Sequence, residues 1–278
     1  MFLATRALGA LALASSLLGP AGAAAAANDS RPLTPGEQAT LLPLVCSEPR
    51  AAAHGETQCS SLIGYPGSNR SGGRFGLTAI IVFTRAGLDQ AYATYSSANE
   101  SHANNFGGGV LFAHSDARWK LLKWFPGRQM DPCVAVPGGR GLKMLCSSGW
   151  GGQGENDTSV WVSSIPPSAG NAASDAAGDV ILQAEDTRGM GGGVESGCEY
   201  RVPKGQVMLL SIDSLTRTGS TPYFAKAQVT YLTAADIASA CNGSHTQRVR
   251  ETKASIQFRE QNGRVTVATP LAFSKLPG

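Results

Sequence analysis

Two successive β-hairpins predicted between Gly107 and Cys146 constrain the fold of this chain more than any other stretch. In the first, the apolar runs VLFAH and RWKLL flank Ser115-Asp116-Ala117, whose short side chains suit a tight turn. In the second, CVAVP and LKMLC flank a loop at residues 138–141, where glycines supply the positive φ that such a loop needs. Folding this hairpin places Cys133 opposite Cys146, and neighbouring strands lie about 5 Å apart, within reach of a disulfide. The stretch predicts antiparallel β structure fastened by a disulfide.

The cysteines indicate an oxidising compartment. Six are present, and in an exported chain they most simply form three disulfides. We predict the sequential pairs Cys46–Cys59, Cys133–Cys146 and Cys198–Cys241, of which only the second has independent support from hairpin geometry. The chain contains no Cys-x-x-Cys motif and no close Cys/His grouping, so we predict neither a metal site nor a cofactor.

The first 27 residues have the pattern of a signal peptide. Arg6 provides the positive end, Ala7–Leu18 is an apolar run, and small residues end at Ala25-Ala26-Ala27, an A-x-A cleavage pattern. An uncleaved membrane anchor is the alternative, but the apolar run is shorter than the roughly 20 residues that a membrane span requires. We therefore predict a periplasmic or secreted protein with no membrane span after cleavage.

The charge of the chain favours no particular partner. Lys and Arg number 23 against 20 Asp and Glu, a formal net charge of +3. The densest basic cluster, Arg248–Lys253, is interrupted by uncharged and acidic residues. A nucleic-acid surface normally needs a denser basic face, so we predict no nucleic-acid partner.

The remaining chain reads as many short apolar strands separated by turn residues. Short helices are expected after Thr34, which has Glu37 at the position of a capping box, and over Thr233–Ala240. The fold class is therefore all-β, either propeller-like or two packed antiparallel β modules, with one or two short helices. The predicted segments are a signal peptide (1–27), an N-terminal loop-rich segment (28–73), a first β module (74–165), a proline-led linker (166–178) and a second β module (179–278).

Two pairs of segments resemble each other in the same order along the chain. FTRAGLDQAYA, at Phe83–Ala93, matches LTRTGSTPYFA, at Leu215–Ala225. Further on, VLFAHSDARWKL matches IQFREQNGRVTV, which pairs Phe112 with Phe258 and Asp116 with Asn262. Chance similarity between β-hairpins is the alternative; we favour duplication of a strand–turn–strand unit plus a hairpin.

These repeated units resemble the blade unit of FG-GAP-type β-propellers. The resemblance lies in a strand, a T/D-x-x-G turn and a second strand, and it covers roughly residues 74–165 and, more faintly, 206–270. The stretch through HANNFGGGVLF and RWKLL also resembles uncharacterised exported bacterial proteins with such blades. FG-GAP turns often carry a DxDxDG calcium loop, whereas Thr84–Gly87 and Thr216–Gly219 lack acidic ladders. Calcium binding is therefore not implied for this chain.

The candidate binding residues lie in predicted loops. Trp124 stands beside Phe-Pro-Gly and Trp150 stands among glycines, where an indole can stack on a ligand ring and where Asn104, Asn105 and Gln153 can add hydrogen bonds. Packing across the gap between two blades is the more ordinary role for these two indoles. The glycine-rich run from residue 149 to 154 matches G-x-G-x-x-G but lacks the βαβ context of a dinucleotide site.

We predict no catalytic residue from the sequence. It contains neither an HExxH motif nor a G-x-S-x-G elbow, and its four histidines are dispersed. We therefore predict an exported, disulfide-stabilised, non-catalytic binding protein of the bacterial envelope or exterior, whose unknown ligand is a glycan or a protein. The alternatives are a secreted hydrolase whose triad is dispersed over loops, and a structural or inhibitory partner protein.

Overall fold

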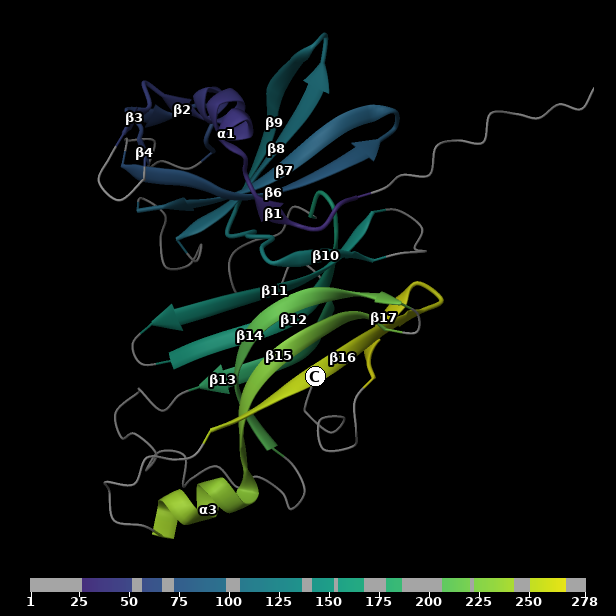
Figure 1. Ribbon diagram of the computed structural model, residues 1–278. Helices are drawn as coiled ribbons and strands as arrows, with labels where there is room; N and C mark the ends of the chain where they lie inside the picture. Colours follow the sequence, from purple (N-terminus) through teal and green to yellow (C-terminus); the bar gives the residue numbers. More distant parts are fainter. Residues whose placement is uncertain are drawn as a thin grey trace, which may run out of the picture.

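The computed structural model describes residues 27–51, 57–66, 73–98, 106–136, 142–152, 155–167, 179–186, 207–220, 223–242 and 251–268. In these ranges the chain forms four antiparallel sheets and two short α-helices (Figure 1). The predicted all-β class with short helices is therefore confirmed.

Two of the sheets have four strands, and the largest has seven; each of these three contains a meander of four strands that follow one another along the chain. Sheet 1 contains, in order, β3 (Arg50–Ala51), β4 (Thr57–Gln58), β6 (Arg74–Arg85), β7 (Leu88–Ser97), β8 (Gly107–Ser115) and β9 (Arg118–Pro126), with β1 (Arg31–Pro32) also paired to β6. Sheet 2 contains β10 (Cys133–Val136), β11 (Lys143–Gly152), β12 (Glu155–Ser164) and β13 (Asp179–Asp186). Sheet 3 contains β14 (Val207–Ser220), β15 (Tyr223–Thr233), β16 (Thr252–Gln261) and β17 (Arg264–Val267). The fourth sheet pairs β2 (Cys46–Ser47) with β5 (Ser61–Leu62).

Sheet 2 is the central layer of a stack of three sheets (Figure 1). Successive residues of a strand point to opposite faces, and the short strand β10 follows this rule. Cys133 and Ala135 pack with Ile81 and Tyr92 of sheet 1, whereas Val134 and Val136 pack with sheet 3. All four residues of β10 are buried, because both faces of sheet 2 are covered.

The observed sheets cut across the module boundary expected from the sequence. β12 pairs with β13 along most of its length, although the predicted linker at 166–178 lies between these strands. A division at that linker would therefore run through sheet 2. The three consecutive four-stranded meanders share their local topology with propeller blades, while the resemblance to the FG-GAP family stays a prediction.

The two disulfides that the described residues contain are the predicted ones. Cys133 lies directly opposite Cys146 in the β10–β11 ladder and is bonded to it. Cys46 is bonded to Cys59. The third predicted pair lies outside what the structure describes, because neither Cys198 nor the side chain of Cys241 is among the described residues.

The two segment matches have different outcomes. The hairpins β8–β9 and β16–β17 turn at corresponding dipeptides, Asp116-Ala117 and Asn262-Gly263, which have positive φ as type I′ turns require. Phe112 and Phe258 are fully buried at corresponding positions. In the other match the turn position differs, because Gly87 forms the β6–β7 turn whereas Gly219 lies within β14. Duplication stays a prediction.

Both short helices begin as the sequence predicts. α1 (Pro35–Leu41) has the Thr34 side chain accepting from the Glu37 N–H, while the Glu37 carboxylate accepts from the Thr34 N–H. It continues into a 3-10 turn over Leu42–Leu44. α3 (Ala234–Asn242) has the same arrangement between Thr233 and Asp236. α1 packs Leu41 against the outer face of sheet 1.

Residues 27–32, here called the N-terminal strap, cover the edges of two sheets. Ala27 bridges to Phe83 and β1 pairs with β6, so the strap runs along one edge of sheet 1. Ser30 and Asp29 form hydrogen bonds with the backbone of β10 at its outer edge. The Ser30 N–H donates to the Cys133 carbonyl, and the Ala135 N–H donates to the Asp29 carboxylate. The strap therefore ties sheet 1 to sheet 2.

Candidate functional site

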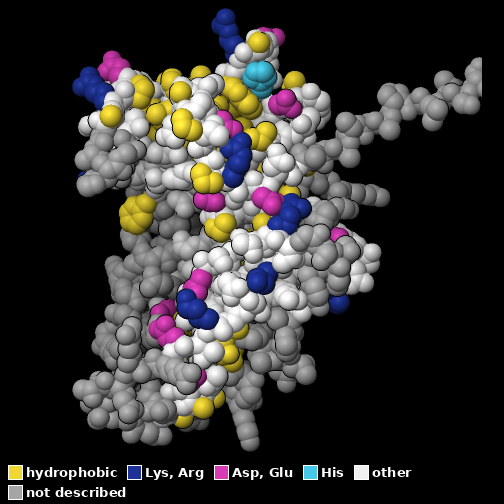
Figure 2. Space-filling view, in the orientation of Figure 1, with side chains coloured by type: hydrophobic (Ala, Val, Ile, Leu, Met, Phe, Trp, Pro, Cys, Tyr) yellow, Lys and Arg dark blue, Asp and Glu magenta, His cyan; other side chains and the backbone are white. Residues whose placement is uncertain are grey.

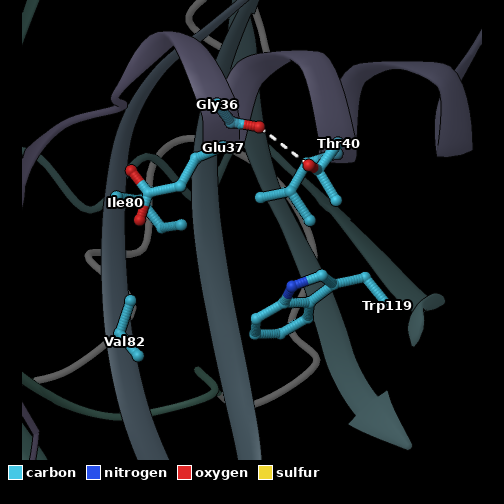
Figure 3. A pocket seen from close by; sticks show the side chains of 7 residues that line it. Gly36, Glu37, Thr40, Ile80, Val82 and Trp119 are labelled. Atoms are coloured by element: carbon cyan, nitrogen blue, oxygen red, sulfur yellow. Dashed lines mark hydrogen bonds between the residues drawn. The ribbon is translucent and has the colours of Figure 1, made fainter. Parts of the chain in front are cut away.

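The outer face of sheet 1 contains a hollow that α1 covers only in part (Figure 3). Its volume is about 160 Å³. The residues that line it come from three elements: Gly36, Glu37, Thr40 and Leu41 from α1, Ile80 and Val82 from β6, and Trp119 from β9. We call it the α1 hollow.

Strand register explains why these residues meet. Ile80 and Val82 alternate on the face that α1 covers, opposite Ala93 and Ala91 of the neighbouring strand. These alanines are small and leave space above the middle of the sheet. Because α1 has 7 residues, it ends before it can cover the whole face. The result is an apolar floor below the helix.

Trp119 forms the far wall of the hollow. It lies opposite His114 in the β8–β9 ladder, and the two ring centroids are 5.1 Å apart. Its side chain is half-buried and packs against the core beneath α1. Figure 3 shows the indole facing the helix across the hollow. An indole in this position offers an apolar surface on which a ligand ring can stack.

The polar groups of the hollow come from α1. The Thr40 hydroxyl donates to the Gly36 carbonyl at 2.8 Å, which leaves its oxygen as an acceptor. The Glu37 carboxylate is held by both terminal nitrogens of Arg31, at 2.8 and 2.6 Å. These hydrogen bonds from Arg31, followed by those from Thr34, outweigh burial and lower the pKa of Glu37 to about 2. Glu37 is therefore ionised at neutral pH, but its charge is already paired.

Polar residues continue beyond the hollow toward the end of the same face. The Thr84 hydroxyl donates to Asp89 at 3.0 Å, and alternation along β8 places His114 on the same face as Phe112. Figure 2 shows acidic, basic and histidine side chains gathered where the β8–β9 hairpin protrudes. The hollow thus lies between an apolar core and a polar rim.

The structure places the predicted binding residues differently. The prediction that Trp124 lies in a loop is wrong: it belongs to β9, is 5% exposed and donates its Nε1 hydrogen to the Ile63 carbonyl. Its ring packs edge-on against Tyr65 and Tyr95 in the buried core of sheet 1. Trp150 was also expected in a loop, and its backbone lies instead in β11. Asn104, Asn105 and Gln153 fall outside the described residues.

Trp119 lines the hollow, although its place in the apolar strand pattern RWKLL is typical of a core residue. The alternation in RWKLL correctly places Trp119 and Leu121 on the apolar face. It could not show that the covering helix would be too short to bury the position next to the turn. The proline at position 43, two residues beyond the end of α1, was the available signal.

The described residues include neither a cluster of metal-ligating side chains nor a membrane-spanning helix. In the ranges that the structure covers, no three His, Cys, Asp or Glu side chains gather in a way that could hold a metal ion. No helix within those ranges is long and apolar enough to cross a membrane.

The family-model scan and the searches of curated proteins and solved structures found no match to this chain.

Proposed function

We propose that this chain is an exported, non-catalytic binding protein of the bacterial envelope or exterior, and that its ligand is a glycan, one ring of which rests against Trp119. The observation that carries the proposal is the α1 hollow, with its apolar floor, its indole wall and its few polar groups. Small-molecule sites typically have this composition. Sugar rings match it because they have one apolar face and hydroxyl groups at the rim.

The size of the hollow sets how much ligand it can hold. Pockets for drug-sized molecules measure roughly 300–1,000 Å³, whereas this one has about 160 Å³. A single ring is therefore held, and the rest of a longer glycan extends over the polar rim near Thr84 and Asp89. We expect modest affinity for a monosaccharide and a gain when the chain of sugars is extended.

The proposed location follows from the disulfides and the leader. Two disulfides in the described chain are what an oxidising compartment produces. The leader pattern at residues 1–27 supports export to the periplasm or the exterior.

Isothermal titration of the oxidised protein against a panel of envelope-type and plant-type oligosaccharides tests the proposal. Trp119→Ala should abolish binding to any sugar that the unmodified chain binds, while Trp119→Phe should retain part of it. Leu122→Ala is the matched control, because Leu122 lies in the same strand and is 52% exposed outside the hollow. Equal binding by the Trp119→Ala and Leu122→Ala variants would reject the site, and no binding by any sugar would reject the ligand class.

A further inference from the structure

The outer edge of β9 is open in the part of the chain that the structure describes. Among the described strands, β9 is the last of sheet 1 and pairs only with β8. The opposite side of the sheet is different, because the N-terminal strap and β4 cover the edge of β6. An uncovered edge presents unpaired backbone donors and acceptors to other chains.

Hairpin geometry identifies which backbone groups face outward. The two-residue turn Asp116-Ala117 makes Ser115 and Arg118 a hydrogen-bonded pair, and such pairs alternate with non-hydrogen-bonded pairs along the ladder. Trp119 and Leu121 are therefore in non-hydrogen-bonded positions, with their N–H and C=O groups pointing away from β8. No described residue forms a backbone hydrogen bond with them across this edge.

The side chains on this edge define its charge. Arg118, Lys120 and Lys123 are all exposed, and Leu122 between them is 52% exposed. Within the described ranges, Asp116 in the turn pairs with Lys120 at 3.0 Å, which offsets one of the three cations. A second copy of this chain would bring the same cations against them, so edge-to-edge pairing of two copies is opposed.

We infer that this edge binds an extended acidic peptide segment of a partner protein, which adds a strand to sheet 1 beside β9. Backbone hydrogen bonds to Trp119 and Leu121 would supply the pairing, as in other cases of strand addition. Acidic side chains of the peptide would meet Arg118, Lys120 and Lys123, and an apolar side chain would cover Leu122. The surface is separate from the glycan site in that it uses the edge and not the face of the strand.

Fluorescence anisotropy with a labelled peptide of 9 residues, the length of β9, that alternates Glu with Val tests this inference. We expect saturable binding that weakens about tenfold in the double variant Lys120→Glu/Lys123→Glu, because charge pairs at the rim become repulsive. Lys143→Glu/Lys226→Glu is the matched control, since it makes the same charge change on sheets 2 and 3 and should leave binding unchanged. The same peptide with Lys in place of Glu should prefer the charge-reversed variant.

Amide hydrogen exchange distinguishes strand addition from simple charge attraction. With the acidic peptide present, the amides of Trp119 and Leu121 should exchange more slowly, whereas dextran sulfate, a polyanion without a peptide backbone, should not protect them. Absence of peptide binding, equal binding by the two double variants, or equal protection by dextran sulfate would each overturn the inference.

Discussion

The contact between the N-terminal strap and sheet 3 allows a quantitative test of how the layers are held together. Asp29 accepts from Arg217 Nε at 2.8 Å and from the Ala135 N–H at 2.7 Å, and a terminal nitrogen of Arg217 also donates to the Ala135 carbonyl at 3.1 Å. One carboxylate thus joins the strap, the edge of β10 and β14. The Asp29 and Arg217 side chains are 35% and 41% exposed, so solvent screens much of their mutual attraction.

The expected cost of removing Asp29 follows from these contacts. The screened ion pair contributes up to about 1 kcal/mol, and the hydrogen bond from Ala135 to a charged acceptor contributes roughly another 1–2 kcal/mol. Asp29→Ala should therefore lower the free energy of unfolding by about 2 kcal/mol. In a double-mutant cycle with Arg217→Ala, the coupling energy should be about 1 kcal/mol. Urea denaturation followed by circular dichroism measures both quantities.

A matched control is available in the pair Arg50–Glu48, whose charged atoms are 3.8 Å apart and whose side chains are 76% and 72% exposed. Arg50→Ala should change stability by less than about 0.5 kcal/mol. A coupling energy near zero for Asp29 and Arg217, or equal losses for Asp29→Ala and Arg50→Ala, would refute the reasoning.

The same contact predicts a pH dependence. Burial raises the pKa of Asp29, but the hydrogen bonds from Arg217 and Ala135 and the Arg217 charge outweigh it, so the pKa is lowered overall. A group with a lowered folded-state pKa stabilises the protein above its unfolded pKa, about 3.9 for Asp. This contribution is lost as the pH falls below that value through the folded pKa. Asp29→Asn should show a smaller decline in stability over that range than the unmodified chain.

Three further predictions concern the sheets. Ala117 has φ +59 in a turn that favours glycine, so Ala117→Gly should raise the free energy of unfolding by about 0.5 kcal/mol, after the entropy cost of glycine is subtracted. Gly263→Ala in the corresponding turn should lower it. A lower melting temperature for Ala117→Gly than for the unmodified chain would contradict the prediction. Replacing Cys133 and Cys146 together by Ala opens a loop with a sequence separation of 13 and should lower the free energy of unfolding by about 3 kcal/mol in the same urea assay. A loss below about 1 kcal/mol would mean that the disulfide contributes little to stability. A Cβ atom at Gly109 would lie 1.8 Å from the Tyr92 hydroxyl oxygen, so Gly109→Ala should lower the free energy of unfolding by roughly 2 kcal/mol because the buried ring must shift. Gly36→Ala is the control, since a Cβ atom there would meet nothing within 4 Å. Equal melting temperatures for the two variants would show that the predicted clash is absent.

Local patterns were sufficient to predict the hairpins. Alternating apolar residues and short polar turns identify β8–β9 and β16–β17, and the position of the two cysteines sets the register of β10–β11. The capping boxes at Thr34 and Thr233 likewise predict where the helices start. In each of these cases the decisive interaction joins residues that are close in sequence.

Glycine-rich strands could not be predicted from the same patterns. The residues around Gly149 read as a loop, but Gly149 pairs with Thr158 in a β11–β12 ladder that extends to Gly152. The glycine run Gly107–Gly109 lacks strand-forming side chains, yet it forms the start of β8 because it pairs with β7 and β9, and the rings of Tyr92 and Tyr95 occupy the space that side chains would need. These strands form because of partners elsewhere in the chain, and intrinsic propensity does not report such partners.

The same limit applies to the candidate site. Trp124 is buried because Ile63 and Tyr65, from a separate loop, cover it. Trp119, five residues earlier on the same strand, lines a hollow because α1 does not extend far enough to bury it. Both indoles have similar sequence surroundings, and only long-range packing separates their roles.

The proposed role of Trp119 can be tested most directly by NMR with ¹⁵N-labelled indole groups. Addition of a bound sugar should shift the Nε1 resonance of Trp119. The Nε1 resonances of Trp124 and Trp161 should stay in place, because these groups donate to the Ile63 carbonyl and to Ser148 inside the protein. A sugar that binds while the Trp119 resonance is unmoved would contradict the proposed site.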